Sequence, residues 1–279
     1  MRFQKIYTEI TNICGLTCSF CPSQTQPTKT MSLDFFEQIL AQANQYTKEV
    51  ALHVMGDPLT LSNLRDYLDI VSKYHLKANI TTSGFYLNGH KNLFHPSLKQ
   101  INISLNSFNK NTPKISFEAY MQGVFKLYEQ RGDADVFINL RLWNLDADNT
   151  EKSYNEQVFA ALEAYFNIKI IPNKKTFRLE RKVLLHFDNY FDWPSLQSEH
   201  FSHGFCHGLN AQIAILADGR VVPCCLDGEG MITLGSLHVG TLKEILNSPK
   251  AKNIIKGFQN KQAVEELCQK CSFKDRFKE

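Results

Sequence analysis

Short apolar segments alternate with amphipathic helical segments along the first 171 residues of the chain. Strands separated by helices of this length require right-handed crossovers and therefore a parallel sheet. About six such units fit, which predicts an α/β fold with a partial (β/α)6 TIM-like barrel instead of a closed eight-fold barrel. The strands are expected at residues 4–10, 49–55, 77–82, 100–105, 135–143 and 167–171, and the helices at 32–46, 61–74, 115–130 and 151–166.

A compact cysteine triad follows the first expected strand. Cys14, Cys18 and Cys21 have the spacing C-x3-C-x2-C, and Phe20 directly precedes the last cysteine. Three thiolates can hold three corners of a cubane iron–sulfur cluster, and the fourth iron then has no local protein ligand. The alternative is a structural zinc site with a distant fourth ligand, but zinc ligands usually come as two spaced pairs. The triad therefore favours a cluster with one open coordination position.

The composition narrows the class of protein. The 279 residues carry a net charge of only +3, which gives no argument for nucleic acid or an anionic membrane surface as a partner. No apolar run reaches the length of a signal peptide core or a membrane span. Eight cysteines without an export signal predict a cytoplasmic location and metal binding instead of disulfides.

The triad resembles the signature of the radical S-adenosylmethionine (SAM) superfamily. The resemblance implies that Cys14, Cys18 and Cys21 bind a [4Fe–4S] cluster and that SAM chelates the open iron. One electron then cleaves SAM to methionine and a 5′-deoxyadenosyl radical, which abstracts hydrogen from a substrate. The resemblance also implies a flavodoxin- or ferredoxin-type reductant as a partner. The protein's task in such a reaction is to bind, orient and seal, since the cofactors supply the difficult chemistry.

Polar segments behind the later strands resemble SAM-binding features of this family. Gly56-Asp57-Pro58 follows the second expected strand, where the family has a Gly-Glu-Pro-like turn that meets the SAM amino group. Thr81-Thr82-Ser83-Gly84 ends the third strand and resembles the family's Thr-Asn-Gly segment, with Ser83 in place of Asn. For both segments the alternative is an ordinary turn or a strand-end cap.

Further SAM contacts are expected from the fourth and fifth strands. Ser104 and Asn106 can reach the SAM ribose or carboxylate, and Arg141 can hold the carboxylate through paired hydrogen bonds. For Phe20 the resemblance implies packing at the adenine, and simple cover over the cluster is the alternative. The expected cofactor-binding residues are thus Phe20, Gly56, Asp57, Pro58, Thr82, Ser83, Ser104, Asn106 and Arg141.

A second cysteine set lies in the C-terminal part of the chain. A hairpin with strands at 212–216 and 220–223 encloses an Asp-Gly turn, and helices are expected at 242–247 and 249–258. A four-thiolate site fits Cys206, Cys224, Cys268 and Cys271, and a zinc ribbon is the alternative to an auxiliary [4Fe–4S] cluster. Next to the triad, the pattern resembles the shortened "twitch" version of the SPASM domain, which favours one auxiliary cluster.

Two adjacent cysteines compete for one position in this set. Neighbouring side chains in a strand point to opposite faces, so only one of Cys224 and Cys225 is expected to bind the cluster. We prefer Cys224 and expect Cys225 to be buried and inert. His207 can replace a thiolate only as a less favoured option. Asp227 is expected to serve the turn that follows, although a role as a base near the substrate is the alternative.

These features predict three regions: a radical SAM barrel at 1–171, a connector at 172–205 and a SPASM- or twitch-like module at 206–279. The connector reads as irregular, with one further strand possible at 184–187. The leading hypothesis is a radical SAM enzyme that abstracts hydrogen from a small-molecule or peptide substrate, with the auxiliary cluster aiding oxidation. The alternatives are a peptide- or protein-modifying maturase, a non-catalytic two-cluster electron carrier or redox sensor, and a structural zinc protein.

Overall fold

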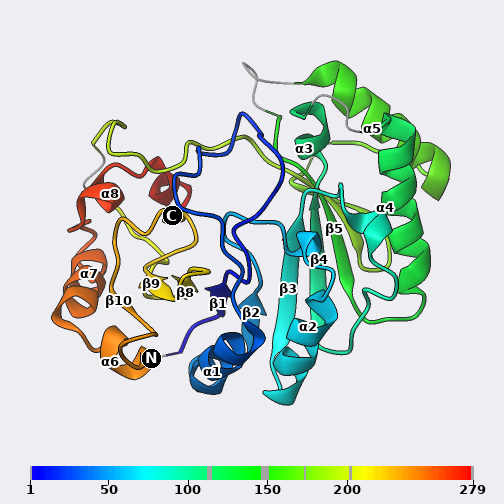
Figure 1. Cartoon of the computed structure of the whole chain (residues 1–279). Helices are drawn as coiled ribbons and strands as arrows, with labels where there is room; N and C mark the ends of the chain where they lie inside the picture. Colours follow the sequence, from blue (N-terminus) through cyan, green and yellow to red (C-terminus); the bar gives the residue numbers. More distant parts are fainter. Residues whose placement is uncertain (1, 112–114, 146–150, 173, 201–202, 278–279) are drawn as a thin grey trace.

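The computed structural model describes residues 2–111, 115–145, 151–172, 174–200 and 203–277. One ten-stranded sheet forms its framework, in the order β10-β9-β8-β1-β2-β3-β4-β5-β7-β6 (Figure 1). The strands are β1 Lys5–Thr8, β2 Glu49–Ala51, β3 Lys77–Thr82, β4 Leu98–Ser104, β5 Phe137–Leu142, β6 Thr176–Glu180, β7 Val183–Phe187, β8 Gln212–Ile215, β9 Arg220–Val222 and β10 Gly235–Ser236.

Six neighbouring strands, β1, β2, β3, β4, β5 and β7, pair in parallel and form the partial barrel. The expected (β/α)6 architecture is therefore confirmed, but its sixth strand lies elsewhere than predicted. Residues 167–171 form no strand, and the sixth parallel strand is β7, inside the segment that was expected to be an irregular connector. The antiparallel partner of β7 is β6 at the sheet edge.

The wrong assignment at 167–171 has a local cause. Helix α5 ends at Phe166, and Asn167 takes a left-handed conformation with φ of 52°. The Ile168 amide donates to the Glu163 carbonyl, and the Ile170 amide donates to the Glu163 carboxylate. Although Ile168 and Ile170 have high β propensity, the backbone that carries them is used to complete the end of α5.

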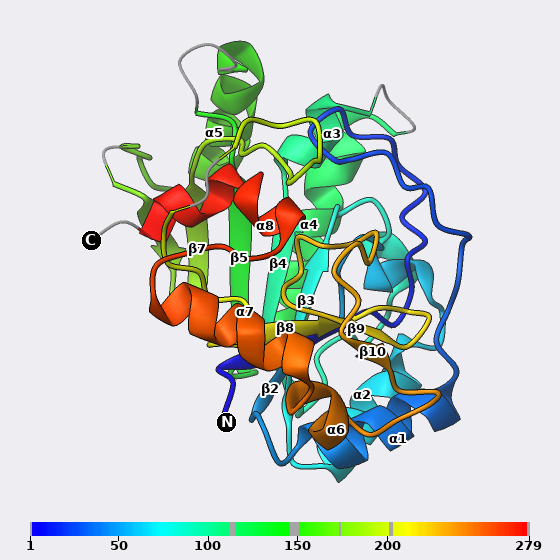
Figure 2. The same ribbon diagram turned by 90° about the vertical axis from the view of Figure 1, so that its left-hand side faces the viewer.

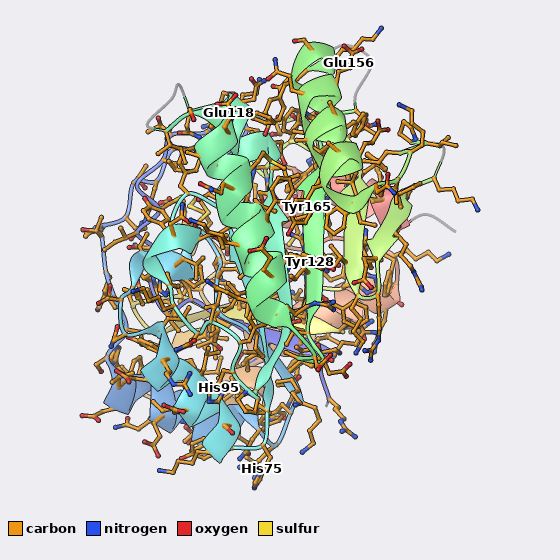
Figure 3. All side chains as sticks on the ribbon, turned by 90° about the vertical axis from the view of Figure 1, so that its right-hand side faces the viewer. His75, His95, Glu118, Tyr128, Glu156 and Tyr165 are labelled. Carbon is orange, nitrogen blue, oxygen red and sulfur yellow. The ribbon has the colours of Figure 1, made fainter. Side chains whose placement is uncertain are left out.

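Helices cover the outer face of the barrel sheet. They are α1 Leu33–Ala43, α2 Leu64–Lys73, α4 Phe117–Arg131 and α5 Lys152–Phe166, with short turns at α3 Asn106–Asn109, η1 Pro58–Thr60 and η2 Leu87–Gly89. Ser32 and Ser116 cap α1 and α4 by accepting from backbone amides three residues on. Helices α4 and α5 lie side by side, and the rings of Tyr128 and Tyr165 meet edge-on with centroids 6.0 Å apart (Figure 3).

The C-terminal part continues the barrel sheet instead of forming a separate layer. Strand β8 pairs in parallel with β1 from Lys5↔Gln212 to Thr8↔Ile215, and β9 and β10 follow as antiparallel strands. Figure 2 shows the helices of this part on the side that faces the viewer. They are α6 Leu242–Leu246, α7 Pro249–Gln259, α8 Glu266–Gln269 and η3 Ser272–Phe277. The β8–β9 hairpin therefore lies directly beside the strand that leads into the cysteine triad.

The inner face of the curved sheet is polar. Asn102 donates to the Ile80 carbonyl at 3.1 Å and accepts from Asn139 at 3.1 Å, and Asn139 in turn contacts His186 at 3.2 Å. The apolar core lies on the other face, between the sheet and helices such as α1, whose Phe36, Ile39 and Leu40 are fully buried. The inner face of the barrel thus carries hydrogen-bonded polar side chains, which can line a site for a polar ligand. Among the described residues, no helix combines the length and apolarity that a bilayer crossing requires.

Candidate active site

A cavity of about 320 Å³ lies at the carboxyl ends of the parallel strands. Sites in parallel α/β folds form at this end, because the loops that follow the strands converge there. The cavity brings together the triad and all but one of the residues predicted to contact SAM; the exception is Pro58, which is buried at the start of η1 and does not line the cavity. Its lining includes Cys14, Cys18, Cys21, Phe20, Gly56, Asp57, Thr82, Ser83, Ser104, Asn106 and Arg141.

The triad loop is held in place by the loop after β3. The Tyr86 hydroxyl donates to the Cys14 carbonyl at 2.8 Å. Gly15 has φ of +72°, and a Cβ at this position would lie 2.3 Å from the Tyr86 hydroxyl oxygen. Only glycine fits here without displacing Tyr86. Within the loop the Cys21 amide donates to the Cys18 carbonyl at 3.0 Å, which turns both thiols toward the same space.

Asn111 contacts the triad, although no sequence motif pointed to it. Its side-chain amide donates to the Cys18 Sγ at 3.0 Å, and its side-chain oxygen accepts from the Thr17 amide at 3.0 Å. Hydrogen bonding by Cys21 and by Asn111 lowers the pKa of the Cys18 thiol to about 6. The same contact with Cys18 raises the pKa of the Cys21 thiol, so Cys18 loses its proton before Cys21 does.

The Gly56-Asp57-Pro58 turn packs directly on the backbone that leads to the triad. A Cβ on Gly56 would lie 2.1 Å from the Thr11 carbonyl oxygen, and the Asp57 amide donates to the Ile13 carbonyl at 3.0 Å. Glycine is therefore required for close backbone approach, whatever the turn binds. The turn that follows β2 and the segment that leads into the triad loop are therefore in direct backbone contact.

The Asp57 carboxylate links the ends of β2 and β3. One oxygen accepts from the Thr82 hydroxyl at 2.9 Å and from the Ser83 amide and hydroxyl at 2.8 and 2.7 Å, and the other accepts from the Leu59 amide at 3.0 Å. Asp57 is only 2% exposed, and burial raises its pKa above the usual range. Both carboxylate oxygens thus have partners within the protein, and the expected contact of Asp57 with a SAM amino group stays a prediction.

Two cationic side chains face the cavity from β1 and β5. The Arg141 guanidinium lies over the Trp143 ring at 4.7 Å, and the Lys5 ammonium lies 5.8 Å from the centre of the Tyr7 ring. Neither forms an ion pair with a carboxylate of the described residues. Burial lowers the pKa of Arg141 to about 10, so that it remains charged at neutral pH. The cavity is therefore complementary to an anionic group such as a carboxylate.

Aromatic rings from distant segments cover one side of the cavity. Phe20 stacks on Tyr190 with ring centroids 5.1 Å apart, and Phe191 packs against Trp193 at 5.5 Å and Phe273 at 5.0 Å. All five line the cavity. Residues 190–193 belong to the segment that was expected to be a connector, and their dense aromatic content was the only sequence signal of this role. They give the triad side of the cavity a partial aromatic cover.

The second cysteine set gathers beside this cavity. Burial raises the pKa of the Cys224 and Cys268 thiols, and the nearby Cys206 thiol raises both further. No three metal-binding side chains of the described residues converge tightly enough for one ion. Four thiols are a donor set that suits a cubane iron–sulfur cluster as well as tetrahedral zinc. The four thiols of this group are Cys206, Cys224, Cys268 and Cys271.

The adjacent cysteines of the hairpin face different surroundings. Cys225 lines the cavity, together with Tyr7 and His53, whereas Cys224 does not. Burial raises the pKa of the Cys225 thiol to about 11. Cys225 was expected to be buried and inert; it lies in the cavity wall, and its inertness stays a prediction. Asp227 accepts from the Met231 and Ile232 amides at 2.8 Å each, which confirms its expected place in the turn.

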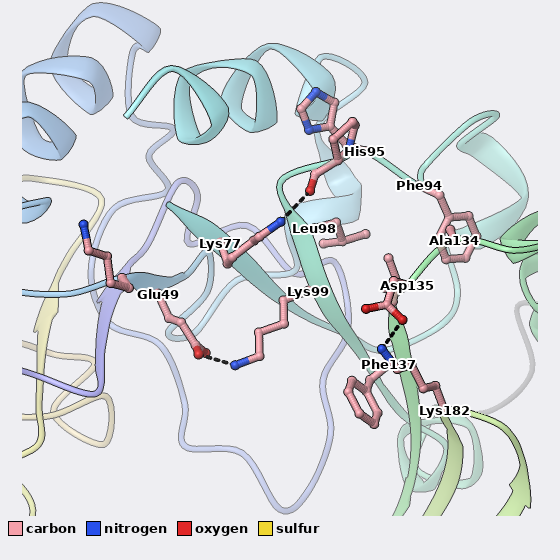
Figure 4. A pocket seen from close by; sticks show the side chains of 13 residues that line it. Glu49, Lys77, Phe94, His95, Leu98, Lys99, Ala134, Asp135, Phe137 and Lys182 are labelled. Carbon is pink, nitrogen blue, oxygen red and sulfur yellow. Dashed lines mark hydrogen bonds and ion pairs between the residues drawn. The ribbon is translucent and has the colours of Figure 1, made fainter. Parts of the chain in front are cut away.

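A second hollow lies at the opposite, amino-terminal end of the strands (Figure 4). It has a volume of about 620 Å³ and is rich in lysine. Lys99 pairs with Glu49, Lys182 pairs with Asp135, and the Lys77 ammonium donates to the Pro96 carbonyl at 3.0 Å. None of the residues predicted for the site lies there. This end of a parallel barrel usually serves stability, and the paired charges agree with that role.

Comparison with known proteins identifies the family to which the chain belongs. A family model described as "Radical SAM superfamily" matches residues 8–146, and the SPASM model, described as "Iron-sulfur cluster-binding domain", matches residues 206–272. The chain belongs to the radical SAM superfamily and carries a SPASM domain. Its cofactors are SAM, a SAM-binding [4Fe–4S] cluster and auxiliary iron–sulfur coordination in the C-terminal part. Such cofactors supply a carbon radical for hydrogen abstraction.

Solved structures share the fold at low sequence identity. BtrN in complex with AdoMet and 2-DOIA is 15% identical, with a TM-score of 0.59 over 98% of this chain and 94% of that chain. The protein anSMEcpe with bound AdoMet is 14% identical, with a TM-score of 0.64 over 96% and 83%. Streptococcus suis SuiB bound to the precursor peptide SuiA is 14% identical, with a TM-score of 0.52 over 100% and 73%. No curated protein matches the chain at a significant level.

Proposed function

We propose that this protein cleaves SAM reductively and uses the resulting 5′-deoxyadenosyl radical to abstract hydrogen from a substrate bound in the cavity above β1–β5. One observation carries the proposal: a single cavity joins the three triad thiols, the predicted SAM-binding segments and the face of the C-terminal module that bears Cys225. A two-cluster electron carrier would need no such enclosed space between its metal sites.

The roles of individual residues are part of this proposal. The triad binds the cluster, Gly56 and Asp57 shape the loop around it, and Arg141 holds a carboxylate. Thr82, Ser83, Ser104 and Asn106 are the polar contacts for SAM, and Phe20 packs at its adenine. The proposed auxiliary ligands are Cys206, Cys224, Cys268 and Cys271, in a module that begins near residue 206.

The substrate is a small molecule or one residue of a peptide. SAM and the substrate share the cavity of about 320 Å³, so the space beside SAM favours a compact substrate or a single side chain. The solved neighbours include one with 2-DOIA bound and one bound to a precursor peptide. A flavodoxin- or ferredoxin-type protein in the cytoplasm is the proposed electron donor, and net oxidation assisted by the auxiliary cluster is one outcome for the substrate radical.

Anaerobic reconstitution tests this proposal. We expect wild-type protein to bind iron and sulfide for two clusters and to release 5′-deoxyadenosine from SAM with dithionite. Replacing Cys14, Cys18 and Cys21 together by alanine should abolish this release while one cluster stays bound. Cys268→Ala should lower the iron content and leave SAM cleavage in place. Iron binding without SAM cleavage by wild-type protein would support an electron carrier, and zinc alone would refute both roles.

A further inference from the structure

A further hollow adjoins the active-site cavity along strands β5, β6 and β7. It has a volume of about 480 Å³ and shares two wall residues with the cavity, Arg141 and Trp143. We call it the side hollow; the rest of its polar lining includes Lys99, Asn139, Lys175, Thr176, His186 and Asp188. Because the two spaces share a wall, the side hollow is placed to receive a part of the substrate that does not face the triad.

Two charged groups of the side hollow already have partners within the protein. Lys99 pairs with Glu49, which lies on the neighbouring inner face of β2. The Asp188 carboxylate accepts from the Arg276 guanidinium at 3.0 Å. These two pairs are neutral as units, so they add little to the net charge of the hollow.

Two further cations of the side hollow have no such partner. Among the described residues, neither Arg141 nor Lys175 forms an ion pair with a carboxylate. Arg141 is partly buried, and its guanidinium contacts the Trp143 ring at 4.7 Å. Lys175 is exposed at the mouth of the hollow, directly before β6. A partly buried cation without an anion is costly, so an anionic occupant would stabilise this wall.

His186 adds no positive charge to this pair. Its Nδ1 atom contacts the Thr176 hydroxyl at 3.0 Å, and its Nε2 atom contacts the Asn139 side-chain oxygen at 3.2 Å. Burial and the nearby Arg141 guanidinium lower the pKa of His186, so the ring is neutral at neutral pH. Both ring nitrogens thus have partners, and the excess positive charge of the described wall comes from Arg141 and Lys175.

We propose that the side hollow binds an anionic end of the substrate, a carboxylate or a phosphate, between Arg141 and Lys175, while the reacting C–H bond faces the triad in the adjoining cavity. This inference rests on the proposed function. A guanidinium binds either group through two parallel hydrogen bonds, and a lysine adds a point charge. The substrate is then an organic acid, a phosphate ester or an acidic residue of a peptide, and not an amine.

SAM does not account for these two cations. Its carboxylate is expected at Arg141 from the cavity side, and the five N–H donors of a guanidinium can serve a second anion. SAM also carries an ammonium and a sulfonium group, so it brings no net negative charge to offset Lys175. Lys175 lines the side hollow but not the cavity that holds the triad. An anion at Lys175 therefore belongs to another molecule.

Binding of simple ions to the reconstituted protein with SAM tests this inference. The probes are glutarate for a carboxylate, inorganic phosphate for a phosphate, and cadaverine as a cationic counterpart of glutarate. In anaerobic isothermal titration calorimetry we expect at least one anion to bind at millimolar concentration and cadaverine not to bind. Lys175→Met should weaken anion binding by about fivefold, the upper range for an exposed ion pair. Arg141→Met should weaken it by more than about tenfold, since charge-assisted hydrogen bonds are lost.

The matched control is Lys174→Met. It removes the same charge one residue away, from an exposed position that lines neither the side hollow nor the cavity. Anion affinity in this variant should stay within about twofold of wild type. High salt should weaken anion binding to wild type, because Lys175 is exposed to screening.

The outcomes separate this inference from the proposed function. Binding of glutarate alone assigns the site to a carboxylate, and binding of phosphate alone assigns it to a phosphate. Four results would each overturn the site: no binding of either anion, tighter binding of cadaverine, equal losses in Lys174→Met and Lys175→Met, or a loss of SAM affinity in Lys175→Met as large as the loss of anion affinity. Absence of 5′-deoxyadenosine from wild-type protein would instead refute the proposed function, since the anion titrations require no SAM cleavage.

Discussion

The side-chain amide of Asn111 lies 3.0 Å from the Sγ of Cys18, although 93 residues separate the two along the chain. The same amide group donates to the Ser107 carbonyl at 2.8 Å, and its oxygen accepts from the Thr17 amide. Asn111 thus fastens the segment after β4 to the triad loop. Its hydrogen bond to sulfur also gives the protein a means to adjust the cluster, since such bonds affect the reduction potential.

Replacing Asn111 by Asp should lower the midpoint potential of the triad-bound cluster. Aspartate keeps the acceptor for the Thr17 amide but has no proton to donate to Cys18, and its negative charge disfavours the reduced state. We expect a shift of tens of millivolts, where about 59 mV corresponds to a tenfold change for one electron. A redox titration followed by electron paramagnetic resonance measures it.

The matched variant is Asn111→Leu, which removes the donor without adding charge. It should shift the potential in the same direction by a smaller amount. An unchanged potential in both variants would show that the contact between Asn111 and Cys18 serves only to position the loop.

Asp57→Asn should destabilise the protein, although the change is nearly isosteric. The Asp57 oxygen that accepts three hydrogen bonds is surrounded by donors from Thr82 and Ser83. If the Asn amide group takes that place, its N–H groups face other donors in a buried site, which costs about 2–3 kcal/mol. Denaturant unfolding measures this loss, and SAM cleavage should fall with it, because the turn packs on the triad loop.

Thr82→Val provides the comparison for Asp57. It removes one donor to the carboxylate and leaves the two from Ser83, so a loss of about 1 kcal/mol is expected. Equal stability of the Asp57→Asn and wild-type proteins would contradict the assigned network.

Much of the fold could be predicted because its elements are local patterns. The expected strands at 77–82 and 135–143 overlap β3 and β5, and the expected helix at 151–166 ends where α5 ends. The strand predicted at 167–171 was wrong because Ile168 and Ile170 instead complete the end of α5 through contacts with Glu163. Propensity alone cannot separate these two uses of a short apolar run.

The site, too, has residues that the sequence predicted and residues that it missed. Cysteine spacing, strand-end positions and the resemblance to the radical SAM family together predicted the residues that meet at the cavity. Asn111, the aromatic cover at 190–193 and the position of Cys225 depend on how β8 pairs with β1 and on which loops come together above the sheet. Contacts between such distant segments leave no periodic signal in a single sequence.

Glu9 should make the stability of the protein depend on pH. It is 2% exposed and accepts from the Met55 amide at 2.7 Å and the Ala217 amide at 3.1 Å. Burial raises its pKa from 4.5 to about 7, against the effect of these hydrogen bonds. The folded state therefore binds more protons than the unfolded state between these values, and stability falls as pH rises through this window, by up to about 3 kcal/mol.

Glu9→Gln cannot titrate and should flatten this part of the profile. The Gln side chain has one acceptor oxygen fewer than the Glu carboxylate, and this difference lowers stability at every pH. The comparison therefore uses the slope of the unfolding free energy between about pH 5 and about pH 8, and not its absolute value. Parallel slopes for the two proteins would show that the pKa of Glu9 is not raised by folding.

Lys274 should raise the reduction potential of the auxiliary cluster. It is only 2% exposed, and its ammonium group donates to the Cys271 carbonyl at 2.7 Å and the Cys268 carbonyl at 3.2 Å. A buried positive charge beside two proposed ligands favours the more negative, reduced cluster, because the potential depends on local charge. Replacing Lys274 by Met keeps most of the side-chain volume and removes the charge, so the auxiliary potential should fall by tens of millivolts, where about 59 mV is tenfold for one electron. The triad-bound cluster in the same sample is the internal control, since its potential should not move; a shift of both clusters, or of neither, would contradict a local electrostatic role for Lys274.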